Sequence, residues 1–358
     1  MLYRESGQFK TSYAADMATF PLRQDRIGIV VILLVAAVGV PLFGSNFLLE
    51  AVLTPFLILS LASVGLNLLT GYTGLISLGT GAFMGVGAYA CYKLTSAFPG
   101  VNLLVWVLVS GLFASAAGVL FGLPSLRIKG FYLIVATLAA QFFLQWCFQR
   151  IGWLRNDSLS GAIEAGTHTL FGVPITGPLS RPWVRYLVVL AIVAGLTWVA
   201  SNILRGRIGR GWTAIRDMDL AAELIGIRPL PTKLLAFAVS SFYCGVAGAM
   251  LVFFWYGSAE AEVFSIDLGF LVLFMVIIGG LGSLIGSFMG AALIHVLPIA
   301  LRSGSVAFGL PIRSATVEQL TFMIVGGLVI AFLIIEPHGL ARLWQIGKQK
   351  LRVWPFPY

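Results

Sequence analysis

Glycine and small polar residues are interspersed with apolar ones between Gly65 and Ala90, in a stretch that reads GLNLLTGYTGLISLGTGAFMGVGAYA. A glycine destabilises a helix interior by about 1 kcal/mol relative to alanine, so an unbroken helix is not expected here. Membranes tolerate broken helices where the freed backbone lines a cavity walled by protein. Neutral groups beside such a break suit hydrogen bonding along a solute path. The residues that we expect to line this path are Asn67, Gly71, Gly74, Ser77 and Gly79.

A second set of neutral polar residues forms one stripe on a predicted helix. Gln141, Gln145 and Gln149 are spaced four residues apart, so they project from one helix face. The stripe is either a polar wall of the path, formed by Gln141 and Gln145, or a set of interhelical hydrogen bonds. Such bonds contribute around 1 kcal/mol each in membranes. The residues alone leave both interpretations open.

The polar segment 205–233 reads RGRIGRGWTAIRDMDLAAELIGIRPLPTK. We expect one short helix from Trp212 to Ile225 that ends at Gly226, because glycine and the prolines beyond it are typical of helix ends. Its alanines would lie near one helix face and allow close approach to a partner, and its charged residues would supply polar contacts. The alternative is an ordinary solvated loop helix. The residues that we expect to dock on a partner are Ala214, Arg216, Asp217, Ala221, Ala222, Glu223 and Gly226.

Several kinds of chemistry lack the residues they need. The chain has no G-x-x-x-x-G-K-[ST] loop for ATP, no H-E-x-x-H, and no Cys/His cluster with metal spacing. His168, His295 and His338 lie far apart in the sequence, without evident catalytic partners. We therefore expect no catalytic residue, no metal and no cofactor. None of the 14 acids lies clearly in the middle of a span, which argues against an ion-coupled carrier.

These residues must be positioned by membrane helices. The 358 residues are 59% hydrophobic and only 10% charged, against about 25% charged in soluble domains. Apolar runs of about 20 residues, the length that crosses a bilayer, recur along the chain. The predicted fold is an all-α polytopic membrane protein with about eight to ten transmembrane segments, some broken or re-entrant at glycines. The basic residues follow the predicted loops rather than forming a nucleic-acid surface, so lipid and not nucleic acid is the expected environment.

The charge pattern gives the predicted orientation. Lys and Arg collect in cytoplasmic loops, which places residues 1–26 inside as an N-terminal segment, 27–335 in the membrane domain and 336–358 inside as a tail. The loop 205–233 then lies inside. This arrangement favours a segment 268–296 that enters and leaves on the outer side as a broken or re-entrant pair, whereas a single crossing would put fewer basic residues inside. Both versions remain open.

Four ordered blocks resemble branched-chain amino-acid-type ABC transporter permeases. The loop and following helix, from Gly209 to Met250, are similar to the family pattern through residues such as Arg210, Ala214 and Arg216. The stretch around Asn67 is similar to N-x-x-x-G-Y-x-G-x-x-S-L-G. Two further blocks are LRIKGFYLIVATLA, Leu126 to Ala139, and GGLGSLIGSFMGAAL, Gly279 to Leu293. The 126–132 block is closest to the larger of the two permease subunits.

The sequence departs from the family pattern at three places. Thr80 stands where relatives have a histidine, NDSLSGAIEAG replaces a glycine-rich outer loop, and Gly245 stands where the pattern has alanine. The first two departures lie near the expected solute route. They leave the substrate open among leucine-like amino acids, urea, short amides and aromatic acids.

The resemblance implies an importer subunit in the inner membrane of a bacterium. Its expected partners are a second permease subunit, two cytoplasmic ABC ATPases that hydrolyse ATP, and an extracytoplasmic solute-binding protein. The permease itself is then not an enzyme. The rival interpretation is a stand-alone secondary carrier or channel for a small neutral solute, and an intramembrane enzyme is a weaker third.

Overall fold

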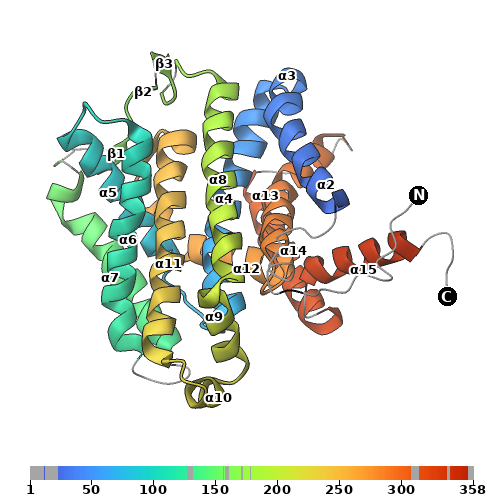
Figure 1. Ribbon diagram of the computed structural model, residues 1–358. Coiled ribbons are helices and arrows are strands. Elements are labelled where there is room, and N and C mark those ends of the chain that lie inside the picture. Colours follow the sequence, from blue (N-terminus) through green and yellow to red (C-terminus); the bar gives the residue numbers. More distant parts are fainter. Residues whose placement is uncertain are drawn as a thin grey trace.

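The computed structural model describes residues 12, 23–126, 132–155, 157, 161–170, 172–177, 179–307, 314–336 and 339–353, and its fold is a bundle of helices (Figure 1). The first half contains α2 (Arg23–Leu34), η1 (Val35–Gly39), α3 (Val40–Phe43), η2 (Leu48–Leu53), α4 (Thr54–Thr73), α5 (Thr80–Ala97), α6 (Leu103–Leu126) and α7 (Tyr132–Arg150). The second half contains α8 (Pro182–Arg205), α9 (Arg207–Asp217), α10 (Asp219–Leu224), α11 (Pro229–Met250), η4 (Leu251–Tyr256), α12 (Ile266–Gly279), α13 (Leu284–Ala307), α14 (Ser314–Ile335) and α15 (Gly339–Val353).

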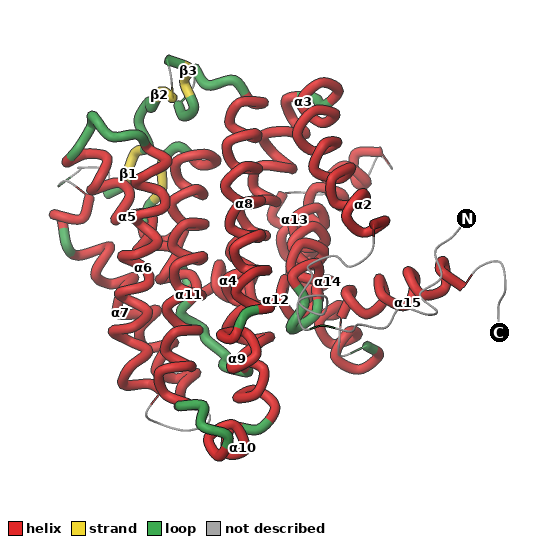
Figure 2. The backbone as a smooth tube through the Cα atoms, in the orientation of Figure 1, coloured by secondary structure: helices red, strands yellow, loops and turns green. Residues whose placement is uncertain are grey.

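Short strands and single helical turns gather at one end of the bundle. They are η3 (Gly152–Arg155), β1 (Ile163–Glu164), β2 (Thr169–Leu170), β3 (Val173–Pro174), β4 (Ser258–Ala259) and η5 (Ala261–Phe264). β1 pairs antiparallel with β4, and β2 pairs antiparallel with β3. Helices α9 and α10 lie at the opposite end (Figure 2). We name these two ends the strand end and the loop end.

The lengths of the helices confirm a multi-pass helical membrane protein. Among the described residues, five helices are long and apolar enough to cross a bilayer, or six if the pair α14 and α15, bent by 60°, counts as one. The five are Leu48–Thr73, Leu103–Leu126, Pro182–Arg205, Pro229–Tyr256 and Leu284–Ser303. Two shorter apolar helices, Ile27–Phe43 and Ile266–Gly279, accompany them. The total of eight to ten segments stays a prediction.

Burial separates central helices from those that face lipid. The α4 span is 83% buried and the α11 span 78%, against 17% for the α8 span. In Figure 1, α11 passes between α6 and α8. The peripheral helices expose large apolar side chains, as expected where the surroundings are hydrocarbon. Examples from α6, α7, α8 and α14 are Leu120, Phe142, Trp198 and Ile330.

Glycine allows the central helices to approach closely. A Cβ on Gly245 in α11 would overlap with the Cβ of Ala114 and lie 3.3 Å from the Cα of Gly111, both in α6. Small residues at such crossings let membrane helices pack backbone to backbone. The departure from alanine at position 245 therefore has a packing reason.

The segment 268–296 is two helices rather than one. Helix α12 ends at Gly279, and α13 then packs back against it in the antiparallel sense. A Cβ on Gly290 would overlap with the carbonyl oxygen of Met275, and one on Gly286 would lie 2.5 Å from that of Gly279. A single straight crossing is therefore excluded. The side of the membrane on which the pair opens stays a prediction.

Candidate functional site

The segment 205–233 forms two helices, so the prediction of one helix from Trp212 to Ile225 is wrong. Met218 has an extended backbone (φ −160°, ψ 98°) and separates α9 from α10. The helical phase is lost at this residue, so the three alanines do not share one face. Ala222 is buried, 2% exposed, whereas Ala214 and Ala221 are half-buried. A bulky residue at position 222 would therefore first disturb the packing of the loop itself.

The outermost surface of the loop end is apolar. Leu220 is 70% exposed, Leu224 89% and Ile225 74%, and Met218 beside them is 66% exposed. The charged side chains of Asp217 and Glu223 are exposed around this patch. The sequence pattern did not lead us to expect it, although leucines four residues apart in a polar helix are a signal for such a surface. Contiguous exposed apolar side chains outside the lipid-facing helices mark an interaction site. We name Met218, Leu220, Leu224 and Ile225 the tip.

The chain leaves α10 at Gly226, where the sequence predicts the end of a helix. Gly226 has φ +90°, a left-handed conformation that side-chain-bearing residues adopt only at a cost. A Cβ at this position would meet nothing within 4 Å. The requirement for glycine here is therefore conformational and not steric.

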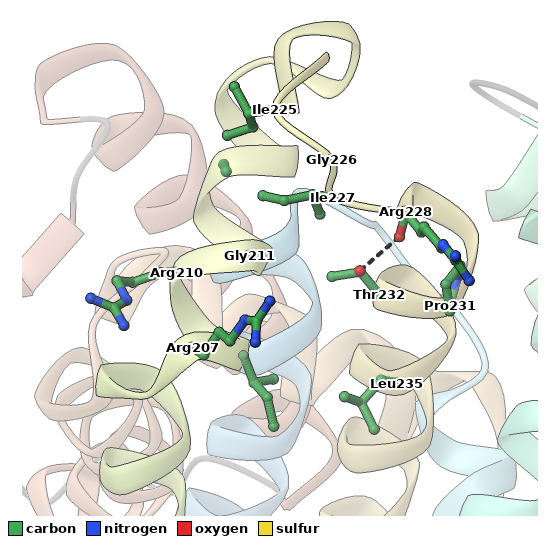
Figure 3. A pocket seen from close by; sticks show the side chains of 12 residues that line it. Arg207, Arg210, Gly211, Ile225, Gly226, Ile227, Arg228, Pro231, Thr232 and Leu235 are labelled. Atoms are coloured by element: carbon green, nitrogen blue, oxygen red, sulfur yellow. Dashed lines mark hydrogen bonds between the residues drawn. The ribbon is translucent and has the colours of Figure 1, made fainter. Parts of the chain in front are cut away.

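A groove of about 670 Å³ lies between α9 and the start of α11 (Figure 3). The side chains of Arg207, Arg210 and Arg228 stand around it, and apolar residues including Leu235 line it. Two contacts hold α9 and α10 against the start of α11. The Nε1 of buried Trp212 donates to the carbonyl oxygen of Thr232 at 3.2 Å. The Nζ of Lys233 pairs with Asp219 at 2.7 Å.

The first helix break follows α4. The helix stops at Gly74, which has φ +73°, and the next helix, α5, begins only at Thr80. Contacts with α7 hold the intervening segment, because Leu78 N donates to Thr137 Oγ1 at 3.1 Å. Ser77 is buried, and its Oγ accepts from Gly79 N at 3.3 Å. Ser77 and Gly79 therefore belong to this break.

Gln141 connects the first break to another segment. Its amide is fully buried; Oε1 accepts from Ala82 N at 2.6 Å and Nε2 donates to the carbonyl oxygen of Phe264 at 2.8 Å. The side chain thus joins α7 to the start of α5 and to η5, the turn that precedes α12. Gln145 is half-buried, and Gln149 is exposed beside a smaller hollow at the strand end. The stripe has no uniform environment, and a path role for Gln141 and Gln145 stays a prediction.

The second break, between α12 and α13, is satisfied by a residue of α4. Asn67 is fully buried; its Nδ2 donates to Ser283 O at 2.9 Å and to Ser287 Oγ at 2.8 Å, and its Oδ1 accepts from Gly282 N at 2.9 Å. Buried backbone groups at a membrane break need such partners. A Cβ on Gly71 would overlap with Gly282 N, so the backbones touch. Asn67 and Gly71 thus bring the two breaks together.

The loop end contacts this junction through Arg216. Its Nη1 donates to the carbonyl oxygen of Gly71 at 3.0 Å, and its Nη2 pairs with Asp217 at 2.9 Å. Five residues of the predicted path and coupling sets thus fall in one connected region. They are Asn67, Gly71, Gly74, Arg216 and Asp217.

A metal centre finds no ligands in the described part of the chain, where no group of three His, Cys, Asp or Glu side chains could hold an ion. His338, and Arg127 and Lys129 of the 126–139 block, lie outside the described residues. The side chains that bond to Leu78 N, Gly282 N and Ser283 O at the two breaks are neutral. Arg216, paired with Asp217, adds a cation beside them at Gly71 O.

A family model described as "branched-chain amino acid transport system / permease component" matches residues 48–334. The chain belongs to this family. The match covers α4 to α14, and so includes both helix breaks and the loop 205–233. The chain is accordingly a transport permease, as its relatives are named, and the resemblance seen in the four sequence blocks is confirmed.

Three curated relatives are similar to most of the chain. The high-affinity branched-chain amino acid transport system permease protein LivM of Escherichia coli is 29% identical over 333 residues, which are 87% of this chain and 73% of the relative. LivM of Salmonella typhimurium is 29% identical over 331 residues, 86% and 73%. A probable LivM of Methanocaldococcus jannaschii is 22% identical over 247 residues, 67% and 69%. No solved structure matches the chain.

Proposed function

We propose that this chain is the membrane subunit of an ABC importer for branched-chain amino acids and passes the movement of cytoplasmic ATPases to a solute path. One observation carries the proposal: an exposed apolar tip on α10 is connected, through α9 and Arg216, to two helix breaks. A soluble partner would cover the tip. The breaks are the parts of the membrane domain best able to change shape.

The tip fits a protein partner rather than lipid. It lies beside the exposed charges Asp217 and Glu223 and the arginines of the groove, which are unfavourable in hydrocarbon. An apolar centre with a charged rim is the usual anatomy of a protein interface. The proposed occupants are the cytoplasmic ATPases, with the groove as part of the same surface.

The path is proposed to run beside the breaks, with Asn67, Gly71, Gly74, Ser77 and Gly79 on it and Gln141 and Gln145 along its wall. These groups are neutral, which suits a solute without net charge. A second permease subunit would complete the enclosure, and a solute-binding protein would deliver the solute at the strand end. The names of the relatives support branched-chain amino acids as the substrate.

The proposed setting is the inner membrane of a bacterium. Residues 1–26, the loop 205–233 and the tail 336–358 would lie in the cytoplasm, with 27–335 as the membrane domain. The distribution of basic residues supports this orientation.

The test is purification of the tagged chain from its native membrane, followed by reconstitution in liposomes. The expected result is co-purification with two ATPases and ATP-dependent uptake of radiolabelled leucine that requires the solute-binding protein. Uptake by the chain alone, driven by an ion gradient and indifferent to ATP, would support the stand-alone carrier instead. Binding of another solute class by the solute-binding protein would reject the substrate but keep the importer.

A further inference from the structure

The guanidinium of Arg216 lies where three segments meet. Its Nη1 donates to Gly71 O at the end of α4, 3.0 Å away. A Cβ on Gly74 would lie 3.1 Å from Arg216 Cγ, and one on Gly282 would lie 3.4 Å from its Nη1. The side chain therefore packs against both helix breaks while its backbone belongs to α9.

The contact with Gly71 has a specific physical basis. Gly71 is in the last turn of α4, whose final four carbonyl groups have no partner within the helix. The C-terminal end of a helix carries partial negative charge, which favours a cation. A charged donor also makes a stronger hydrogen bond than a neutral one. Asp217 accepts from Arg216 Nε at 3.0 Å and so helps to orient the guanidinium.

Asn67 extends the connection from α4 to the second break. Its amide bonds to Gly282 N, Ser283 O and Ser287 Oγ, so the α12–α13 turn is fixed to α4 one turn before Gly71. Gly74 and Gly282 both have positive φ, +73° and +77°. They are positions where the chain direction can change with little displacement elsewhere, as at the hinges of other moving segments.

We propose that Arg216 is a positioning residue that passes displacement of α9 and the tip to both helix breaks at once. The inference rests on the proposed function and adds the residue through which movement of the loop end reaches the membrane domain. The side chain of Arg216 is 39% exposed, but its Nη1 donates into the bundle at Gly71 O, so we assign it the transmission of movement rather than the binding of the ATPase. Removing it should separate ATP hydrolysis from uptake while leaving the docking surface intact.

The experiment uses the complete complex in liposomes and compares wild type with Arg216→Gln and Arg216→Lys. Three quantities are measured: ATPase retained on purification, rate of ATP hydrolysis, and leucine taken up per ATP hydrolysed. For Arg216→Gln we expect unchanged ATPase retention, hydrolysis within about two-fold, and a fall of about ten-fold in uptake per ATP, as the loss of about 1.4 kcal/mol of coupling would give. Arg216→Lys keeps the charge but not the planar donor geometry. Its uptake per ATP should therefore lie between that of wild type and that of Arg216→Gln.

The matched control is Lys350→Gln, which removes one positive charge from α15, where the side chain is exposed and away from the junction. It should keep wild-type uptake per ATP. In a double variant, Arg216→Gln with Gly282→Ala, the fold-decrease in uptake per ATP should be smaller than the product of the two single-variant decreases. The reason is that both changes act on one contact region. Independent, multiplying losses would contradict a shared junction.

Two further outcomes overturn the inference. The first is wild-type uptake per ATP in Arg216→Gln, or in Arg216→Lys if the glutamine variant does not assemble. The second is a loss of uptake that only follows lost ATPase retention, since that is a docking defect. Absence of ATPases from the wild-type complex is a separate result, which rejects the proposed function itself.

Discussion

At the residue scale, two buried amide side chains, those of Asn67 and Gln141, satisfy backbone groups at the helix breaks. Asn67 and Gln141 together bond to Gly282, Ser283, Ala82 and Phe264, and each of these lies at or beside a break or a helix start. Water is not available to such groups in the membrane interior, so the amides take its place. Their first consequence is a defined geometry for the breaks.

Replacing Asn67 by leucine should disrupt the second break. The change keeps the approximate volume but leaves Gly282 N and Ser283 O without their partner, at about 1–3 kcal/mol for each unsatisfied group. We expect a lower midpoint of thermal unfolding in detergent and a large loss of leucine uptake. Asn202→Leu, at an exposed position of α8, is the matched control and should do neither. Equal thermal midpoints for the two variants would contradict the role of Asn67.

His168 gives the strand end a dependence on pH. Burial lowers the pKa of its imidazole below the usual value of 6.5, although a hydrogen bond with the Ala165 backbone opposes the shift. A depressed pKa in the folded state means that the stabilisation is present above pH 6.5 and is lost as the pH falls through the folded-state pKa. The β2–β3 hairpin should therefore exchange amide hydrogens faster at pH 5 than at pH 7.5, after correction for intrinsic rates. His168→Phe should remove this difference, and its persistence would assign the effect to other groups.

At the element scale, short helices at the loop end divide two tasks. Helix α9 is fixed to the bundle by buried Trp212 and by Arg216. Helix α10 presents the tip, and Ala222 packs inward beneath it. One element therefore faces the membrane domain and the other faces the proposed partner, with Met218 between them.

Leu224→Gln should weaken ATPase docking. Burial of a leucine side chain contributes about 1.5–3 kcal/mol, so loss of most of this at an interface lowers affinity about ten-fold or more. The expected result is loss of ATPase on purification, with an unchanged thermal midpoint for the chain itself because Leu224 is 89% exposed. Lys350→Gln, at an exposed position of α15 outside this surface, should retain the ATPase. Full retention in Leu224→Gln would show that the tip is not the docking surface.

The sequence predicts local features of these elements better than their contacts. The left-handed end at Gly226 and the breaks near Gly74 and Gly282 follow from glycine within otherwise helical patterns, and their φ values agree. The hydrogen bond between Asn67 and Gly282 could not be predicted from the sequence, because composition and periodicity carry no information on contacts between residues 215 positions apart. The prediction of a shared alanine face was wrong for a different reason. Met218 has an extended backbone, so the side chains of α10 are rotated relative to those of α9.

At the scale of the whole molecule, the fold is organised around two buried helices. Helices α4 and α11 are enclosed, while α6 and α8 face outward with large apolar side chains. A membrane protein gains no hydrophobic stabilisation from helix association in lipid, so close packing through small residues must supply it. The positions of the glycines in α11 therefore determine whether the bundle closes.

Gly245→Val should prevent this closure. The added side chain would overlap with Ala114 and press on Gly111, and overpacking of this kind costs about 1–3 kcal/mol or more. Gly195→Val in α8 is the matched control, since a Cβ there would meet nothing within 4 Å. We expect aggregation of the first variant on detergent extraction and normal gel filtration of the second. A normal elution profile for Gly245→Val would contradict the packing described for α6 and α11.

The orientation of the whole molecule can be tested by cysteine labelling. A cysteine at Leu220 should react with an impermeant maleimide only in inside-out vesicles, and one at Leu179 only in right-side-out cells. Both side chains are exposed, at 70% and 78%, so access to them is determined by the membrane and not by burial. The three native cysteines would first be replaced by serine or alanine. Labelling of position 220 in intact cells would reverse the proposed topology.

The enclosure of α11 also imposes an order on biosynthesis. Residues 229–250 emerge from the ribosome long after α4, α5 and α6 have entered the membrane, yet they fill the space among those three helices. Until then, the glycine surfaces of α4, α5 and α6 must be covered by lipid or by the insertion machinery. The packing of α4, α5 and α6 is completed only when α11 arrives, and α12 and α13 pack on α4 later still. A nascent chain interrupted before residue 229 would expose these unpaired helix surfaces to quality-control proteases.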